Sequence, residues 1–158
     1  MATRTLLLRA GSARDIDLVD ALMMQSFDPR YGEAWTRSQC LGVLAMPGVR
    51  LLIAFLDDEP AGFALTRVIV DEVELLLLAT LPAQRRRGVG ATLLRALLAE
   101  AEGEGLKRMH LEVRAGNEAV RLYAEYGFVK AGERRGYYRG RTGQLHDAHT
   151  YSRELASS

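Results

Sequence analysis

The chain has 158 residues, of which 48% are hydrophobic and 26% are charged, and its formal net charge is +1. This length suffices for one domain whose core needs no disulfide or metal, so we expect a single domain over residues 1–158. The near-neutral balance argues against a protein that wraps nucleic acid or adsorbs to a membrane, although arginines can still gather in a local patch. We therefore expect neither nucleic acid nor membrane as a partner.

Cysteine content and apolar runs bear on the compartment. The single cysteine, Cys40, excludes an intrachain disulfide framework, and its apolar helical neighbours favour a small buried side chain over a nucleophile. The N-terminus lacks a long apolar core followed by a cleavage site, and the densest apolar run, residues 74–79, is too short to span a bilayer. These features predict a cytoplasmic protein.

The first half of the chain predicts two helices and four strands. In chain order we expect a strand over 5–9, a helix after Ser12, a loop at 28–32, a helix from Thr36 to about 47, and strands over 51–56, 61–70 and 73–81. Ser12 and Asp15 have the spacing of a capping box. The strand over 73–81 is apolar on both faces, which suits the centre of a sheet.

The second half alternates helices and strands. We expect a long helix that follows Gly90 and ends at Gly103–Gly105, a strand over 107–114, a short helix over 117–125, and closing strands over 128–135 and 144–153. Along 107–114 the apolar residues alternate with His110, Glu112 and Arg114, which share the opposite face. The chain lacks repeats and linkers, and the pattern is that of one mixed α/β domain.

Two glycines mark the start of the long helix. Gly88 and Gly90 let the backbone approach a ligand closely, and a helix N-terminus attracts anions, so this loop suits a phosphate. Three arginines, Arg85 to Arg87, add positive charge. A tight turn with solvated arginines explains the glycines equally well, and a nucleic-acid patch is a third reading that the charge balance weakens. The spacing excludes a Walker loop and fits a Rossmann fingerprint poorly.

The sequence around this loop resembles that of one family. Arg85-Arg86-Arg87-Gly88-Val89-Gly90 is similar to the Gln/Arg-x-x-Gly-x-Gly/Ala motif of the GNAT superfamily of acyl-CoA transferases. The supporting segments are 74–82, Leu111-Glu112-Val113-Arg114 with Asn117, 122–128 and 136–138. Together, over residues 73–155, they resemble the ribosomal-protein-alanine N-acetyltransferases (RimI-type), whereas the first seventy residues match loosely.

The resemblance implies a fold and a cofactor site. The fold would be α/β (α+β), a single GNAT domain whose mixed central sheet carries helices on both faces and holds acetyl-CoA between two splayed strands. The residues implied for the cofactor are Leu78, Ala79 and Thr80 along the pantetheine arm, Arg86, Arg87, Gly88, Val89, Gly90 and Ala91 at the pyrophosphate, and Asn117 from the next helix. No metal is expected, because the transfer requires none.

Two residues match the family's proton-transfer groups. Glu112 matches the general base; from spacing alone it could instead be an exposed glutamate paired with Arg114 or Lys107. His110 shares its face and is the alternative base, since its free pKa suits proton transfer near neutral pH. Tyr123 matches the general acid that protonates the departing CoA thiolate.

Alternatives remain open around the acid. Tyr123 could simply pack over Phe128, as helix aromatics commonly do. The family usually has one more residue between its asparagine and its Leu-Tyr pair than Asn117 and Tyr123 allow. Either the start of this helix is tighter than in the family, or the asparagine's role falls one position away from Asn117.

The C-terminal hairpin resembles the family's acceptor side. Tyr137 and Tyr138 could grip a peptide backbone or could pack on the sheet edge, and the sequence does not separate these roles. Asp147, flanked by His146 and His149, could in principle bind a metal, but alternation puts His146 and Asp147 on opposite faces.

These features lead to one function and two alternatives. We expect direct transfer of the acetyl group of acetyl-CoA to an amine, with a protein N-terminal α-amine, that of a ribosomal protein, as the family's acceptor. The alternatives are a GNAT enzyme acting on a small-molecule amine and a non-catalytic acyl-CoA-binding sensor. The sequence does not fix the oligomeric state.

Overall fold

The computed structural model describes residues 5–85 and 87–156. Its main elements are β1 (Leu6–Gly11), α1 (Ile16–Ser26), α2 (Arg37–Leu44), β2 (Val49–Leu56), β3 (Glu59–Ile69), β4 (Glu72–Thr80), α3 (Val89–Gly103), β5 (Arg108–Arg114), α4 (Ala119–Glu125), β6 (Val129–Arg139) and β7 (Leu145–Glu154). The strands form one seven-stranded sheet in the order β1-β2-β3-β4-β5-β7-β6. All neighbouring strands are antiparallel except β4 and β5, which are parallel.

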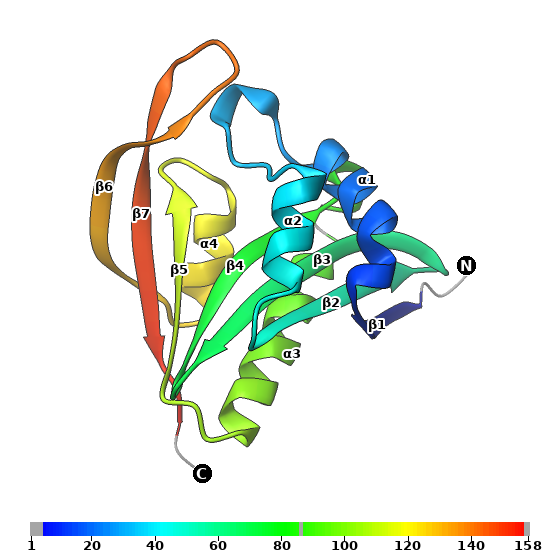
Figure 1. The fold of residues 1–158 in the computed structure, drawn as a ribbon. Helices are drawn as coiled ribbons and strands as arrows, with labels where there is room; N and C mark the ends of the chain where they lie inside the picture. Colours follow the sequence, from blue (N-terminus) through cyan, green and yellow to red (C-terminus); the bar gives the residue numbers. More distant parts are fainter. Residues whose placement is uncertain (1–4, 86, 157–158) are drawn as a thin grey trace.

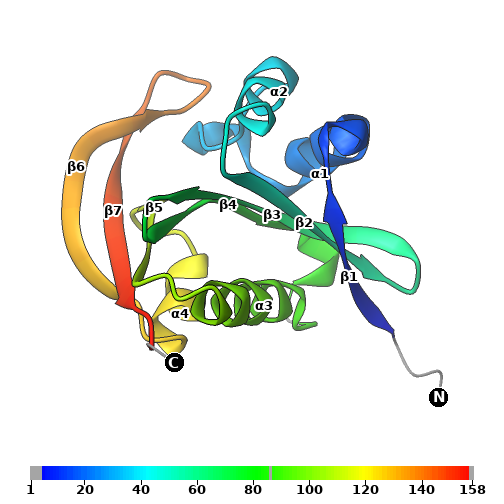
Figure 2. The ribbon, with the colours of Figure 1, turned by 60° about the horizontal axis from the view of Figure 1, so that its bottom comes forward.

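Helices cover both faces of this sheet. Figure 2 shows α1 and α2 above it and α3 and α4 below it. Each face has its own core: Ile53, Phe63 and Leu65 are fully buried on the α1–α2 side, and Leu93 and Met109 on the α3–α4 side. The expected mixed sheet with helices on both faces is therefore confirmed.

Capping boxes precede the two N-terminal helices. Ser12 and Asp15 form a box, with Asp15 Oδ2 accepting the backbone N–H of Ser12 at 3.0 Å; it caps a 3₁₀ turn over Ala13–Asp15, from which α1 continues at Ile16. Thr36 and Gln39 form a second box at the start of α2. Between the helices, residues 29–31 form a short 3₁₀ turn within the expected loop.

The sheet opens between β4 and β5. Their pairing runs only over Glu72–Leu75 and Arg108–Leu111, after which the two strands separate (Figure 1). A bulge places Leu76 outside the β3–β4 register, because Leu65 faces Leu77 and Thr66 faces Leu75. A bulge bends its strand and increases the local twist, which accounts for the departure of β4 from β5. The expected splayed strand pair is present.

The C-terminal strands form the far edge of the sheet. Strand β6 runs to Arg139, four residues beyond the expected end, with an irregular register between Arg134 and Tyr138. The β6–β7 turn meets the loop after α1, where the N–H of Arg141 donates to the carbonyl of Pro29 at 3.0 Å (Figure 1). None of the helices in the described ranges is long and apolar enough to cross a membrane.

Candidate active site

The opening between β4 and β5 exposes main-chain groups on one side of β4. Leu78, Ala79 and Thr80 pair with β3 on one edge, whereas β5 pairs with β4 only as far as Leu75. The edge of β4 that faces the opening thus has no strand partner in the described structure. Unpaired main-chain N–H and C=O groups along such an edge suit the amides of an extended ligand arm.

The glycine loop lies at the end of β4. Gly88 adopts φ +81° as the N-cap of α3, a conformation that favours glycine, and its lack of a side chain leaves the first turn of α3 without a side-chain cap. A Cβ on Gly90 would lie 3.3 Å from the Leu122 side chain and 3.5 Å from Thr80 Oγ1. Gly90 therefore allows the start of α3 to pack closely against β4 and α4.

The arginines before Gly88 differ in their surroundings. Arg85 donates through Nη2 to the carbonyl of Ser26 at 2.9 Å, at the C-terminal end of α1. This contact ties the loop to the C-terminal end of α1. Arg87 is exposed beside the loop, and the predicted contact Arg86 lies outside the described residues. Val89 is buried and Ala91 is half-buried, so any phosphate contact from them comes from the main chain.

Glu112 lies where the strands have separated. His110 is opposite Glu74 within the paired part of β4 and β5, whereas Glu112 comes one residue after the last pair. Both belong to the polar face of β5, as the alternation predicts, since Met109 and Leu111 are buried on the other face. Because Glu112 lies beyond the last strand pair and His110 lies within the paired part, Glu112 is the better placed of the two to reach the opening.

The partner of Glu112 differs from both expected ones. Arg134 of β6 places Nε 3.0 Å from Glu112 Oε1, while Arg114 pairs with Glu33 and Lys107 with Asp71. The Glu112 side chain remains 24% exposed, so solvent or an amine can approach it.

Tyr123 of α4 is buried. Its ring packs edge-on against Phe128 at 5.7 Å between centroids, the contact expected of a packing tyrosine. Burial raises the pKa of Tyr123, and the charge of Glu33 and the nearby Tyr138 raise it further. The phenol is therefore protonated at neutral pH, the form in which it can donate a proton.

A side-chain cluster that the sequence did not predict joins the α1–α2 loop to β5 and α4. Glu33 accepts from Arg114 Nε at 3.1 Å and from Asn117 Nδ2 at 2.7 Å, and the Glu33 and Arg114 side chains are only 10% and 12% exposed. The guanidinium of Arg114 lies 3.6 Å from the centroid of the Tyr31 ring. The partners are more than eighty positions apart, so no local pattern signals them.

Asn117 is engaged within this cluster. Its Oδ1 accepts the N–H of Ala119, the first residue of α4, at 2.8 Å, while its amide donates to Glu33 at 2.7 Å. Both ends of the side chain thus have protein partners here, and cofactor contact by Asn117 stays a prediction.

The β6–β7 hairpin borders the same region. Tyr137 is 49% exposed and Tyr138 is half-buried, with their rings edge-on at 5.0 Å. Burial raises the pKa of Tyr138, with Glu33 and Glu112 adding to the shift. Asp147 accepts the N–H of Gly136 at 2.9 Å and so supports the hairpin. Among the described residues no group of three metal-ligating side chains occurs.

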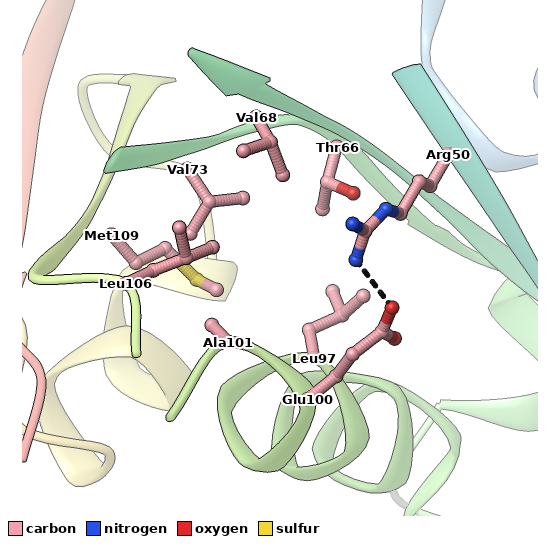
Figure 3. A pocket seen from close by; sticks show the side chains of 9 residues that line it. All are labelled: Arg50, Thr66, Val68, Val73, Leu97, Glu100, Ala101, Leu106 and Met109. Atoms are coloured by element: carbon pink, nitrogen blue, oxygen red, sulfur yellow. Dashed lines mark hydrogen bonds and ion pairs between the residues drawn. The ribbon is translucent and has the colours of Figure 1, made fainter. Parts of the chain in front are cut away.

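Two hollows elsewhere in the described structure are weaker candidates for an active site. Figure 3 shows a crevice between the sheet and α3, closed on one side by the Arg50–Glu100 ion pair. Its volume is about 10 Å³, room for one water at most. A shallow groove of about 360 Å³ runs along α2 and is lined by Trp35, Ser38, Gln39, Gly42 and Val43, which provide no titratable group.

Comparisons with known proteins agree with this geometry. Residues 16–128 match the acetyltransferase (GNAT) family. The [ribosomal protein bS18]-alanine N-acetyltransferase of Salmonella typhimurium (strain LT2) is 46% identical over 83 residues, which are 52% of this chain and 56% of that protein. The chain thus spans about half the length of the curated relatives it matches.

Solved structures match over nearly the whole chain. The ribosomal-protein-S18-alanine N-acetyltransferase from Escherichia coli superposes with a TM-score of 0.86 at 26% identity, covering 98% of this chain and 96% of that one. Ard1 from Thermoplasma volcanium gives a TM-score of 0.81 at 26% identity, covering 96% and 99%. The chain belongs to the acetyltransferase (GNAT) family.

Proposed function

We propose that this protein transfers the acetyl group of acetyl-CoA to an N-terminal α-amine, and that its acceptor is the alanine terminus of a ribosomal protein. The observation that carries the proposal is the opening between β4 and β5 with Glu112 directly after the last strand pair. The named activity of the relatives from Salmonella typhimurium and Escherichia coli supports the choice of acceptor. A bacterial ribosomal acceptor would also place the protein in the cytoplasm.

The donor would lie along the free edge of β4 and the start of α3. Main-chain groups at Leu78, Ala79 and Thr80 would hold the pantetheine arm, and an N–H there would face the carbonyl oxygen on which charge develops. The first-turn N–H groups of α3, at Val89 to Ala91, would hold the pyrophosphate, assisted by Arg86 and Arg87.

Two side chains would move the protons. Glu112 would accept the proton of the attacking amine, directly or through a water, while the new C–N bond forms. Tyr123 would give its proton to the sulfur as the C–S bond breaks, so that CoA leaves as a thiol. No protein nucleophile is required, because the amine attacks the thioester carbonyl itself.

The acceptor class follows from proton affinity. A free α-amine has a pKa of about 8, against about 10.4 for lysine, so a carboxylate base deprotonates it more readily at neutral pH.

A thiol-release assay with acetyl-CoA tests the proposal. The acceptors are a peptide with a free N-terminal alanine, an N-terminally blocked peptide that contains lysine, and a set of small amines. We expect CoA release with the alanine peptide alone. CoA release only with the lysine peptide or with small amines would contradict an α-amine acceptor. Binding of acetyl-CoA without any release of CoA would indicate a non-catalytic sensor.

A further inference from the structure

The proposed base has an ion-pair partner two strands away. Arg134 of β6 places Nε 3.0 Å from Oε1 of Glu112 on β5, and β7 lies between these two strands in the sheet (Figure 1). Neighbouring strands lie about 4.8 Å apart, so two strand spacings, roughly 10 Å, separate the two backbones. A contact over this span requires that the side chains of β7 leave a path across the sheet.

The strand between them has small residues on the shared face. Residues directly opposite one another in a sheet point to the same face, and Glu112 is opposite Thr150, which is opposite Gly132. In the next row, the buried Ala148 of β7 is opposite Arg134. Among the described residues, none outside the immediate neighbours of Gly132 comes within 4 Å of a Cβ placed there. These small residues therefore leave room for the Arg134 side chain to extend across β7.

A nearer arginine is engaged elsewhere. Arg114 follows Glu112 by two positions on the same face of β5, so alternation favours it as the partner. Its guanidinium instead pairs with Glu33 at 3.1 Å and lies 3.6 Å from the centroid of the Tyr31 ring. Over residues 5–85 and 87–156, Arg134 is the one side-chain cation within 4.0 Å of the Glu112 carboxylate.

The backbone of β6 supports Arg134 at this position. The strand leaves its regular register directly after Arg134, and residues 135–137 lie opposite the single residue Asp147. Asp147 accepts the N–H of Gly136 at 2.9 Å and so supports this bulge. Within the bulge, the Tyr137 ring centroid is 5.3 Å from the Arg134 guanidinium, within cation–π range. Bulges commonly aim side chains next to active sites, and here the guanidinium has a second contact besides the carboxylate.

Stability and edge protection do not account for the pair. Exposed ion pairs contribute little to stability, and the Arg134 and Glu112 side chains are 62% and 24% exposed. A charge that protects the edge strand β6 against pairing needs no carboxylate two strands away.

The pair bears on the proposed chemistry. In the proposed function, on which this inference rests, Glu112 accepts the amine proton and must be held where the amine arrives. We propose that Arg134 is a positioning residue, whose guanidinium holds the Glu112 carboxylate at the opening between β4 and β5, ready to accept that proton.

A double-mutant cycle on kcat tests whether Arg134 acts through Glu112, with the acceptor that gives CoA release. Arg134→Ala should lower kcat about 10-fold in the wild-type background, a usual size for coupling between charged groups in contact. In the Glu112→Gln background the same change should leave kcat unaltered. The KM for the acceptor and the dissociation constant for acetyl-CoA should hardly change. As the matched control, Arg135→Ala removes an equal charge from the next residue of β6, which is exposed, and should retain the wild-type kcat.

Guanidinium rescue separates positioning from a general structural role. Arg134→Ala leaves space at an exposed position, so guanidinium ions added below denaturing concentrations should restore part of the lost kcat. They should restore nothing when Glu112→Gln is also present, and the thermal midpoint of Arg134→Ala should match that of the wild type.

The outcomes separate this inference from the proposed function. A drop in kcat for Glu112→Gln, combined with an unchanged or raised kcat for Arg134→Ala, would overturn the role of Arg134 alone. The same holds for an equal loss from Arg134→Ala in both backgrounds, or for a loss that guanidinium does not recover. Full turnover in Glu112→Gln would overturn the base assignment and the role of Arg134 together.

Discussion

The proposed donor side and the proposed acceptor side of the opening are built differently. On the donor side, β4, the glycine loop and α3 follow one another in sequence and present mainly main-chain groups. On the acceptor side, the α1–α2 loop, the end of β5, α4 and the β6–β7 hairpin are held together by side chains distant in sequence. We therefore expect a local donor site to tolerate sequence change outside its glycines, and the acceptor side to depend on individual long-range pairs.

The largest effect is expected at the point where the two sides meet. Glu112→Gln keeps the shape of the side chain but removes the proposed base, so kcat should fall about 1,000-fold, within the usual range for general-base groups. Acetyl-CoA affinity, measured by calorimetry, should hardly change. The control is His110→Gln, because His110 lies in the paired part of the strands. If His110→Gln abolishes turnover and Glu112→Gln does not, the base is His110.

Loss of the proposed general acid, Tyr123, should give the second-largest effect on kcat. Tyr123→Phe retains the packing on Phe128 but has no proton to give, so kcat should fall about 100-fold while acetyl-CoA affinity stays nearly the same. Steady-state kinetics and calorimetry measure the two quantities. Unchanged turnover would show that Tyr123 is a packing residue only and that another group protonates the CoA thiolate.

The acceptor side should be the more sensitive to loss of one charge. Arg114→Met removes the cation that pairs with the carboxylate of Glu33, whose side chain is only 10% exposed, and the free energy of unfolding should fall by about 3 kcal/mol. The Arg37–Asp17 pair, 51% and 88% exposed, is the matched control, and Arg37→Met should cost under about 1 kcal/mol. Chemical denaturation measures both values.

The same variant separates stability from acceptor binding. At temperatures where the variant remains folded, Arg114→Met should raise the KM for the peptide about 10-fold and leave acetyl-CoA affinity unchanged. The reason is that Glu33 belongs to the α1–α2 loop on the proposed acceptor side. An increase in the dissociation constant for acetyl-CoA, with no change in the KM for the peptide, would contradict the division into a donor side and an acceptor side.

The smallest effect concerns alkaline pH. Because burial raises the pKa of Tyr123, the folded state holds the phenolic proton more tightly than the unfolded chain does. This stabilisation is fully present below about pH 10 and is lost as pH rises through the folded pKa, with a slope of up to about 1.4 kcal/mol per pH unit. Tyr123→Phe should flatten the decline of thermal stability above pH 10. The exposed Tyr137 is the control, and Tyr137→Phe should retain the wild-type decline.

The sequence predicted most of the fold because most of its signals are local. Capping boxes at Ser12 and Thr36, alternation along β5 and the glycines at α3 all act within a few residues. The expected separation of β4 and β5 came from the family resemblance, because a bulge at Leu76 leaves no signal in the run of leucines from Leu75 to Leu78.

The acceptor side could not be predicted in the same way. Nothing near Glu33 indicates that its partners are Arg114 and Asn117, and Glu112 proved to pair with Arg134 rather than with a neighbour on its own strand. Long-range pairs depend on how elements pack, which periodicity does not encode. The length of β6 was missed for a related reason, because Gly136 within it resembles a turn.

One measurement tests the central claim most directly. A peptide that has both a free N-terminal alanine and an internal lysine is incubated with the enzyme and acetyl-CoA, and tandem mass spectrometry locates the added acetyl group. Acetyl transfer to an N-terminal amine predicts modification of the alanine nitrogen alone, abolished in Glu112→Gln. Acetylation confined to the lysine side chain would contradict it.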